Sequence, residues 1–89
     1  MQELGAMKIK SKALGRYLKE RRLELKATRN TISKKLGYPN AQSIYNWEKG
    51  LAIPPTVIWR KLIKAYKITP DEWLSIMISE IEDQIRRYV

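Results

Sequence analysis

The sequence predicts an all-α fold, a single compact domain of four to five helices. Apolar residues recur every three or four positions along most of the chain, which is the spacing of one helix face. Glycine, proline and threonine residues stand where such segments would start or stop. The 89 residues include no Phe, so one small core must be built from Leu, Ile and the three Trp residues.

The domain is expected to comprise residues 11–89. Residues 1–10 show no sustained periodicity and are expected to form a loose basic arm or the remnant of a tag. If the arm is functional, its lysines would reach DNA phosphates or the minor groove.

The first helix is expected to begin after Ser11 and to run to about Leu25. Leucines form its apolar stripe, and Arg22 lies on the same stripe. A buried charge without a partner is costly, so Arg22 needs an acidic partner. Glu48, on a later helix, is expected to supply it. The alternative is that Arg22 extends into solvent and that Glu48 is solvated.

Two short helices are expected next, over residues 28–36 and 40–50. Thr28 is a suitable N-cap for the first of them, and Gly37 and Gly50 are suitable ends. The turn between them contains a glycine and a proline. Two short helices joined by such a turn are typical of the helix-turn-helix arrangement, in which the second helix enters the DNA major groove.

The second of these helices has an apolar face and an amide-rich face. At about 100° per residue, Ile44 and Trp47 point inward, while Gln42, Asn46 and Lys49 gather on the opposite side. Amide side chains can bind the edge of an adenine, and a lysine can neutralise a phosphate. We therefore expect Gln42 and Asn46 to read bases. The margin of this reading face is expected to be Ala41, Ser43 and Tyr45.

Other residues are candidates for binding DNA phosphates together with Lys49. Arg29 falls in the first turn of its helix, where backbone amides already favour an anion. Lys34 and Lys35 fall on the outer side of the same helix, where a merely solvated face is the alternative. Asn40, at the start of the expected reading helix, completes this group.

Residues 14–74 resemble the lambda-repressor-like family of helix-turn-helix domains, which includes Cro and the phage repressors. The resemblance rests on the combined spacing of Arg22, Thr28, Arg29, Ile32, Ser33, Leu36, Gly37, Gln42, Ser43, Ile44, Trp47, Glu48, Lys49, Gly50 and Pro54. It implies a DNA-binding domain in which Arg22 holds Glu48 and in which Ser33 packs where two helices cross closely. Arg29 stands where the family usually has glutamine, and the turn around Pro39 is one residue longer than the common form.

A fourth helix is expected to start at about Pro55 and to end at about Tyr66, because prolines cannot continue the preceding helix. Thr69, Pro70 and Glu72 then predict the start of a last helix, with Thr69 and Glu72 as a capping box.

The last helix, over about residues 70–89, is expected to be extended and amphipathic. Trp73 and Leu74 are close enough to the fourth helix to join the core, whereas the later apolar residues would project beyond it. These later residues are candidates for a homodimer interface: Ile78, Ile81, Ile85 and Tyr88. The alternative is that the helix folds back on its own domain.

The charge distribution favours a polyanionic partner. The net charge is +9, and residues 1–50 carry twelve basic and four acidic side chains. A solubilising surface is the alternative explanation. With the expected reading helix, the charge predicts double-stranded DNA as the partner, and a homodimer would require a palindromic operator.

Several chemistries are excluded or not expected. The chain contains no Cys and no His, which excludes disulfides, Cys/His zinc sites and the common nucleophile–histidine pairs. Glu80, Glu82 and Asp83 are interpreted as a solvated helix face, so we expect no catalytic residue, metal, cofactor or small-molecule ligand. No apolar run is long enough for a membrane span, and we expect a cytoplasmic, nucleoid-associated protein.

The function predicted from the sequence is sequence-specific DNA binding by a bacterial or phage transcriptional regulator. A domain this small is expected to repress transcription, including its own, by promoter occlusion. The alternative is an antitoxin-like protein-interaction module that also binds DNA.

Overall fold

The computed structural model describes residues 12–87, which form five α-helices and a short 3₁₀ helix with no strand. In chain order the elements are α1 (Lys12–Glu24), α2 (Arg29–Leu36), α3 (Gln42–Glu48), η2 (Thr56–Ile58), α4 (Trp59–Tyr66) and α5 (Pro70–Arg87). The all-α prediction is therefore confirmed. The expected arm (residues 1–10), the expected cap Ser11 and the dimer candidate Tyr88 lie outside the described residues.

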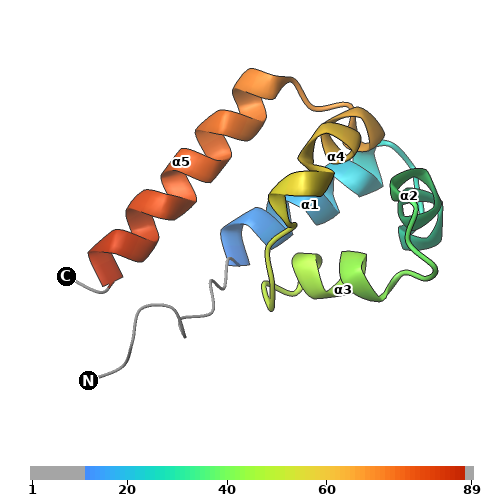
Figure 1. Ribbon diagram of the computed structural model, residues 1–89, viewed down its shortest axis with the longest axis horizontal. Coiled ribbons are helices and arrows are strands. Elements are labelled where there is room, and N and C mark those ends of the chain that lie inside the picture. Colours follow the sequence, from blue (N-terminus) through green and yellow to red (C-terminus); the bar gives the residue numbers. More distant parts are fainter. Residues whose placement is uncertain (1–11, 88–89) are drawn as a thin grey trace.

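Helix α1 lies in the middle of the domain and packs against α3, α4 and α5 (Figure 1). Each helix contributes apolar side chains to one core, whose buried members are Leu14, Leu18, Ile32, Leu36, Ile44, Trp47, Leu62, Ala65, Tyr66, Ile68, Trp73 and Met77. Apart from Ile68, which lies between α4 and α5, these residues lie at the helical spacing expected from the sequence, and each helix buries one face in the core.

The ends of α2 and α3 follow from local hydrogen bonding. The Thr28 Oγ1 atom accepts a hydrogen bond from the Thr31 amide at 3.0 Å, which caps α2. Gly37 ends α2 with φ of 83°, and Gly50 follows α3 with φ of 75°, a region that favours glycine. Helix α3 starts at Gln42, two residues later than expected, and in the turn before it the Asn40 Oδ1 atom accepts a hydrogen bond from the Gln42 amide at 2.9 Å.

Helices α1 and α3 cross closely at Gly15. A Cβ atom at this position would lie only 2.5 Å from the Trp47 carbonyl oxygen and 2.6 Å from that of Glu48. Glycine in a helix interior costs conformational entropy, so its presence here is explained by the space that α3 occupies. The α1–α3 crossing thus fixes the end of α3 against the body of the domain.

The segment expected as one helix from Pro55 is divided in two. Thr56–Ile58 forms the 3₁₀ turn η2, and α4 begins at Trp59. The Trp59 Nε1 atom donates to the Pro54 carbonyl at 2.9 Å, and its ring meets that of Trp73 edge to face with centroids 5.5 Å apart. Trp59 therefore packs at the rim of the core.

The capping box at the start of α5 is present. The Glu72 amide donates to Thr69 Oγ1 at 3.1 Å, and the Thr69 amide donates to Glu72 Oε1 at 3.1 Å. This reciprocal pair fixes where the last helix starts.

Two expectations for α5 are wrong. Leu74 is 57% exposed and does not join the core. Glu80 is only 6% exposed, not solvated, and its Oε1 atom accepts from the Leu14 amide at 3.1 Å. The reason is that α5 lies beside the start of α1, where a carboxylate can accept from a free amide of the first helical turn. Trp73, Met77 and Glu80 form the buried side of α5, so the helix does fold back on its own domain.

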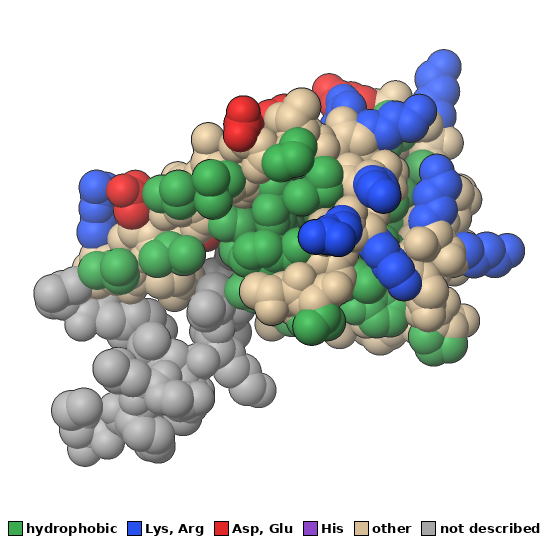
Figure 2. Space-filling view, turned by 45° about the horizontal axis from the view of Figure 1, so that its top comes forward, with side chains coloured by type: hydrophobic (Ala, Val, Ile, Leu, Met, Phe, Trp, Pro, Cys, Tyr) green, Lys and Arg blue, Asp and Glu red, His purple; other side chains and the backbone are tan. Residues whose placement is uncertain are grey.

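The opposite edge of α5 remains exposed. Leu74, Ile78, Ile81 and Ile85 are between 48% and 58% exposed, and Figure 2 shows a row of apolar side chains along this helix. The apolar arc of α5 is therefore wider than its contact with the domain.

Candidate nucleic-acid interface

The outer face of α3 carries two adjacent amide side chains. Gln42 is exposed and Asn46 is half-buried, and the Gln42 Nε2 atom donates to Asn46 Oδ1 at 3.0 Å. The Gln42 Oε1 and Asn46 Nδ2 atoms make no hydrogen bond within residues 12–87. One acceptor and one donor of this pair therefore remain available for a ligand.

An open hollow lies next to this amide pair. It is lined by Arg29, Asn40, Ala41, Gln42 and Tyr45, which come from α2, the turn and α3. Ala41 and Ser43, expected at the margin of the reading face, are both half-buried, whereas Tyr45 is exposed. The structure thus brings most of the expected reading residues to one surface.

One buried carboxylate joins three helices beneath that surface. Glu48 is 8% exposed, and its oxygens accept from Arg22 Nε at 2.7 Å and Arg22 Nη2 at 3.0 Å. The Arg22 Nη1 atom donates to the Ala27 carbonyl at 3.0 Å. The hydrogen bond to Glu48 raises the pKa of Arg22, although burial acts in the opposite direction. The ion pair expected from the sequence is present, and it is bidentate.

Arg29 is a second partner of the same carboxylate, which the sequence analysis did not foresee. Its Nε atom lies 3.0 Å from Glu48 Oε1, while its side chain is still 33% exposed. The Arg29 guanidinium carbon lies 5.3 Å from the Tyr45 ring centroid, and the Lys49 Nζ atom lies 5.5 Å from it. Two cations therefore flank an exposed aromatic ring beside the amide pair of α3. The terminal nitrogens of Arg29 make no hydrogen bond within the described part of the chain.

A family model described as a helix-turn-helix domain matches residues 13–74, from α1 to the first turns of α5. The chain belongs to the helix-turn-helix family. This agrees with the resemblance to lambda-repressor-like domains, and helix-turn-helix domains are typically DNA-binding domains without enzymatic activity. No curated protein and no solved structure gave a significant match.

In this helix-turn-helix domain, α2 and α3 are the two helices of the motif, and Tyr38 in the turn packs edge to face on Trp47 with ring centroids 5.7 Å apart. The turn is thus tied to the core although it is longer than the common form. Ser33 is buried on α2, and its hydroxyl donates to the Asn30 carbonyl of the same helix at 2.8 Å. The buried hydroxyl is therefore hydrogen-bonded within α2.

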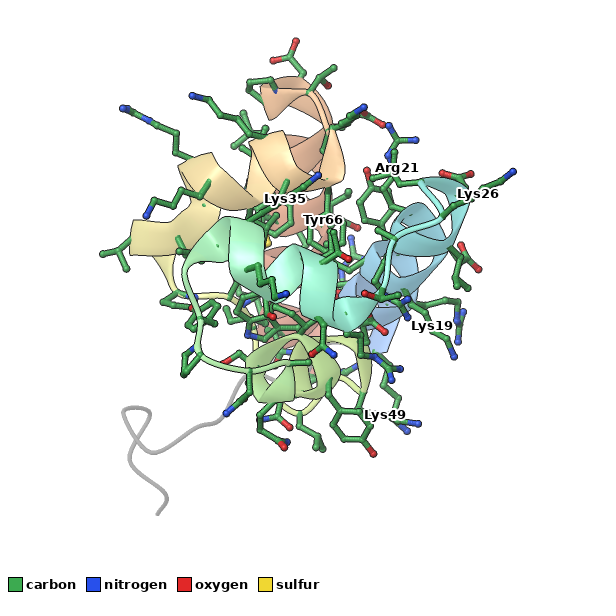
Figure 3. All side chains as sticks on the ribbon, turned by 90° about the vertical axis from the view of Figure 1, so that its right-hand side faces the viewer. Lys19, Arg21, Lys26, Lys35, Lys49 and Tyr66 are labelled. Carbon is green, nitrogen blue, oxygen red and sulfur yellow. The ribbon has the colours of Figure 1, made fainter. Side chains whose placement is uncertain are left out.

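The remaining phosphate candidates occupy different sides of the helix-turn-helix domain. Lys34 and Lys35 are exposed at the end of α2, and Lys49 is exposed at the end of α3. Figure 3 shows Lys35 on the side toward α4, whereas Lys49 lies on the far side, beside α3. Asn40 accepts from the Gln42 amide through its side-chain Oδ1 atom and is part of the hollow. Lys35 and Lys49 are thus poorly placed to contact the same stretch of backbone.

Two residues that position the site were missed in the sequence. Arg21 donates from Nε to the Tyr66 carbonyl at 3.0 Å and from Nη2 to the Lys67 carbonyl at 2.8 Å, and so caps α4 (Figure 3). Gly15 allows α3 to approach α1, and a glycine inside a helical pattern was a readable signal. Arg21 had no such signal, because its partners are backbone atoms 45 and 46 positions away.

Other kinds of site are not visible among the described residues. Within residues 12–87, no three or more His, Cys, Asp or Glu are grouped as a metal site would require. No described helix is long and apolar enough to cross a membrane. The buried Tyr66 hydroxyl has no hydrogen-bond partner within the described residues, and burial raises its pKa well above the ordinary value.

Proposed function

We propose that this domain binds double-stranded DNA sequence-specifically, with α3 in the major groove, and regulates transcription by occluding a promoter. The observation that carries the proposal is the Gln42–Asn46 pair on the outer face of α3. Regulation of its own gene is included in the proposal.

The amide pair has the chemistry to read an adenine. In the major groove an adenine presents N7 as an acceptor and its N6 amino group as a donor. The Gln42 Oε1 atom can accept from N6, and the Asn46 Nδ2 atom can donate to N7. Because the two amides already hold each other, less side-chain freedom is lost on binding. Ala41, Ser43 and Tyr45 would contact neighbouring bases at the margin.

Phosphate contacts would fix the register of α3 on the duplex. Lys49 and the terminal nitrogens of Arg29 flank Tyr45 on the reading surface, and Asn40 lies beside them. Glu48 holds Arg29 at Nε, which leaves the forked end of the guanidinium for a phosphate. Lys34 completes the set proposed for this duplex, at the outer side of α2.

Selection of bound duplexes from a random library tests the proposal, because it reports both the preferred site and its symmetry. On that site, Gln42→Ala is expected to cost about 1 to 3 kcal/mol and to relax the preference at one base pair. Binding to unrelated duplexes should change little.

The matched comparison is Lys49→Ala, which should weaken binding to every duplex alike. Fluorescence anisotropy with the selected duplex and an unrelated duplex separates the two effects. A Gln42→Ala protein that loses affinity equally for both duplexes would contradict base reading by Gln42.

A further inference from the structure

Helix α4 carries a second basic surface, separate from the reading face. Its basic side chains, with the residue that ends the helix, are Arg60, Lys61, Lys64 and Lys67, and all four are exposed. No acidic residue occurs between positions 49 and 70, and none of the four makes an ion pair within residues 12–87. Figure 2 shows Lys and Arg side chains gathered over α4. We call these four residues the α4 basic surface.

The stability of α4 does not explain this surface. Arg60 and Lys61 lie in the first turn, at the positive end of the helix dipole, where cations are unfavourable. Arg60 and Lys64 are four residues apart, so two like charges repel on adjacent turns. Lys64 and Lys67 are at the favourable end, but Arg21 already binds the carbonyls of Tyr66 and Lys67 there.

The α4 basic surface and the reading face of α3 lie on different sides of the domain. The buried side of α4, with Leu62, Ala65 and Tyr66, packs into the core, and the helix contacts α1 and α2. In Figure 3, Lys35 lies toward α4 while Lys49 lies at the opposite side, beside α3. A duplex bound along α3 would therefore leave the outer face of α4 open.

We propose that the α4 basic surface, extended by Lys35, binds a second DNA duplex through its phosphates without sequence preference. One protein molecule would then hold two duplex segments together. The proposal rests on the proposed function for the first duplex, at α3, and adds a second site with a different chemistry of recognition.

The composition of the surface favours a nucleic acid over an acidic protein. Every exposed side chain of α4 is Lys or Arg, and its apolar side chains are buried or half-buried. Protein–protein interfaces have an apolar centre from which charged residues are depleted. Interfaces with DNA are more polar and strongly positive, and phosphate contacts alone supply binding without sequence preference.

A bridging assay with the full chain tests the proposal. A duplex with the selected site is tethered to beads, the protein is added, and retention of a second, labelled duplex that lacks the site is measured. The wild-type protein should retain the labelled duplex at low salt and release it as salt rises. The Arg60→Gln, Lys64→Gln double variant should lower retention by about tenfold.

Binding of the tethered duplex is measured separately, by anisotropy, and should stay within about twofold for this variant. The control is the Arg16→Gln, Lys19→Gln double variant, which removes two exposed charges from α1 and should bridge as the wild type does. A failure of specific binding would appear in the anisotropy of the wild-type protein and would overturn the proposed function. In that case, binding of the labelled duplex to the wild-type protein and to the α4 variant, without a tethered duplex, still tests the α4 basic surface.

Three results would overturn the second site. The α4 variant could retain as much labelled duplex as the wild type, or the α1 control could lose as much as the α4 variant. An acidic polypeptide such as poly-glutamate could also bind the wild-type protein, but not the α4 variant, more tightly than duplex DNA does. That last result would assign the surface to an acidic protein partner.

Discussion

At the scale of single residues, Glu48 connects the core to the reading face. Its carboxylate accepts from Arg22 on α1 and from Arg29 on α2, while its own helix carries the amide pair on the opposite side. Its side chain is only 1% exposed, so these partners replace water. Glu48 is therefore a polar link from α3 to both other helices, in addition to the apolar core and the close α1–α3 crossing at Gly15.

Arg22 and Glu48 are predicted to couple in a double-mutant cycle. Glu48→Met would leave Arg22 buried without its main partner and should destabilise by up to about 3 to 5 kcal/mol. Arg22→Met should cost less, because Glu48 keeps Arg29. The double variant, with both residues replaced by Met, should recover much of the lost free energy of unfolding. Urea unfolding measures the cycle, and additive losses would contradict coupling.

Lys49 is predicted to bind a phosphate, and the salt dependence of affinity reports it. Each phosphate contact adds about 0.9 to the slope of log affinity against log salt, so Lys49→Ala should flatten the slope by about one per bound subunit. Lys19→Ala, at an exposed position of α1, is the control and should leave the slope unchanged. An unaltered slope for Lys49→Ala would remove Lys49 from the interface.

Sequence reasoning predicted the amide pair and the ion pair of the candidate site but not its full geometry. The amide face and the Arg22–Glu48 pair followed from helical periodicity and from the cost of a buried charge. The bond from Arg29 to Glu48 did not, because it depends on how α2 sits against α3 across a turn of unusual length. The hydrogen bond from the Gln42 amide to the Asn40 side chain was missed for a similar reason, since the start of α3 shifted by two residues.

At the scale of elements, α5 shows where periodicity stops being informative. Its apolar residues form one wide arc in the sequence, and the structure buries one edge of that arc while exposing the other. Which edge is buried depends on α1, whose Leu14 amide is bound by Glu80. A helical pattern reports that a face is apolar, but it does not report which neighbour covers it.

The α1–α3 crossing gives a prediction for Gly15. Gly15→Ala would place a methyl group about 2.5 Å from the Trp47 carbonyl oxygen, so α3 must move away from α1. Overpacking of this kind costs about 1 to 3 kcal/mol or more, and the displaced α3 should also bind DNA less tightly. Arg16→Ala, at the exposed neighbouring position, should stay within about 0.5 kcal/mol. Equal unfolding temperatures of the Gly15→Ala and Arg16→Ala variants would contradict a tight crossing of α1 and α3.

At the scale of the whole molecule, the two basic surfaces and the exposed apolar edge of α5 lie on different helices. The reading face and the α4 basic surface carry cations, whereas the exposed edge of α5 carries Leu74, Ile78, Ile81 and Ile85. Figure 2 shows the apolar row on α5 beside the basic residues over α4. A chain with a net charge of +9 opposes self-association through its basic faces, so α5 is the surface on which two copies can meet.

The protein is accordingly predicted to form a two-fold dimer through the exposed edge of α5. Such a dimer would place two α3 helices about 34 Å apart and would require a palindromic site with half-sites about 10 base pairs apart. Because the buried edge of α5 belongs to the core, the test replaces only exposed residues. Light scattering at tens of micromolar should show a dimer for the wild type and a monomer for the Ile78→Ser, Ile81→Ser variant.

The control for this test is the Leu51→Ser, Val57→Ser variant, which removes two exposed apolar side chains that lie outside α5. It should remain dimeric, because these two side chains are not part of the proposed interface on α5. Stable interfaces bury about 800 Å² per partner, and four half-exposed side chains supply only part of that area, so we expect palindromic DNA to strengthen the dimer. A wild-type protein that is monomeric at tens of micromolar would exclude α5 as a dimer interface.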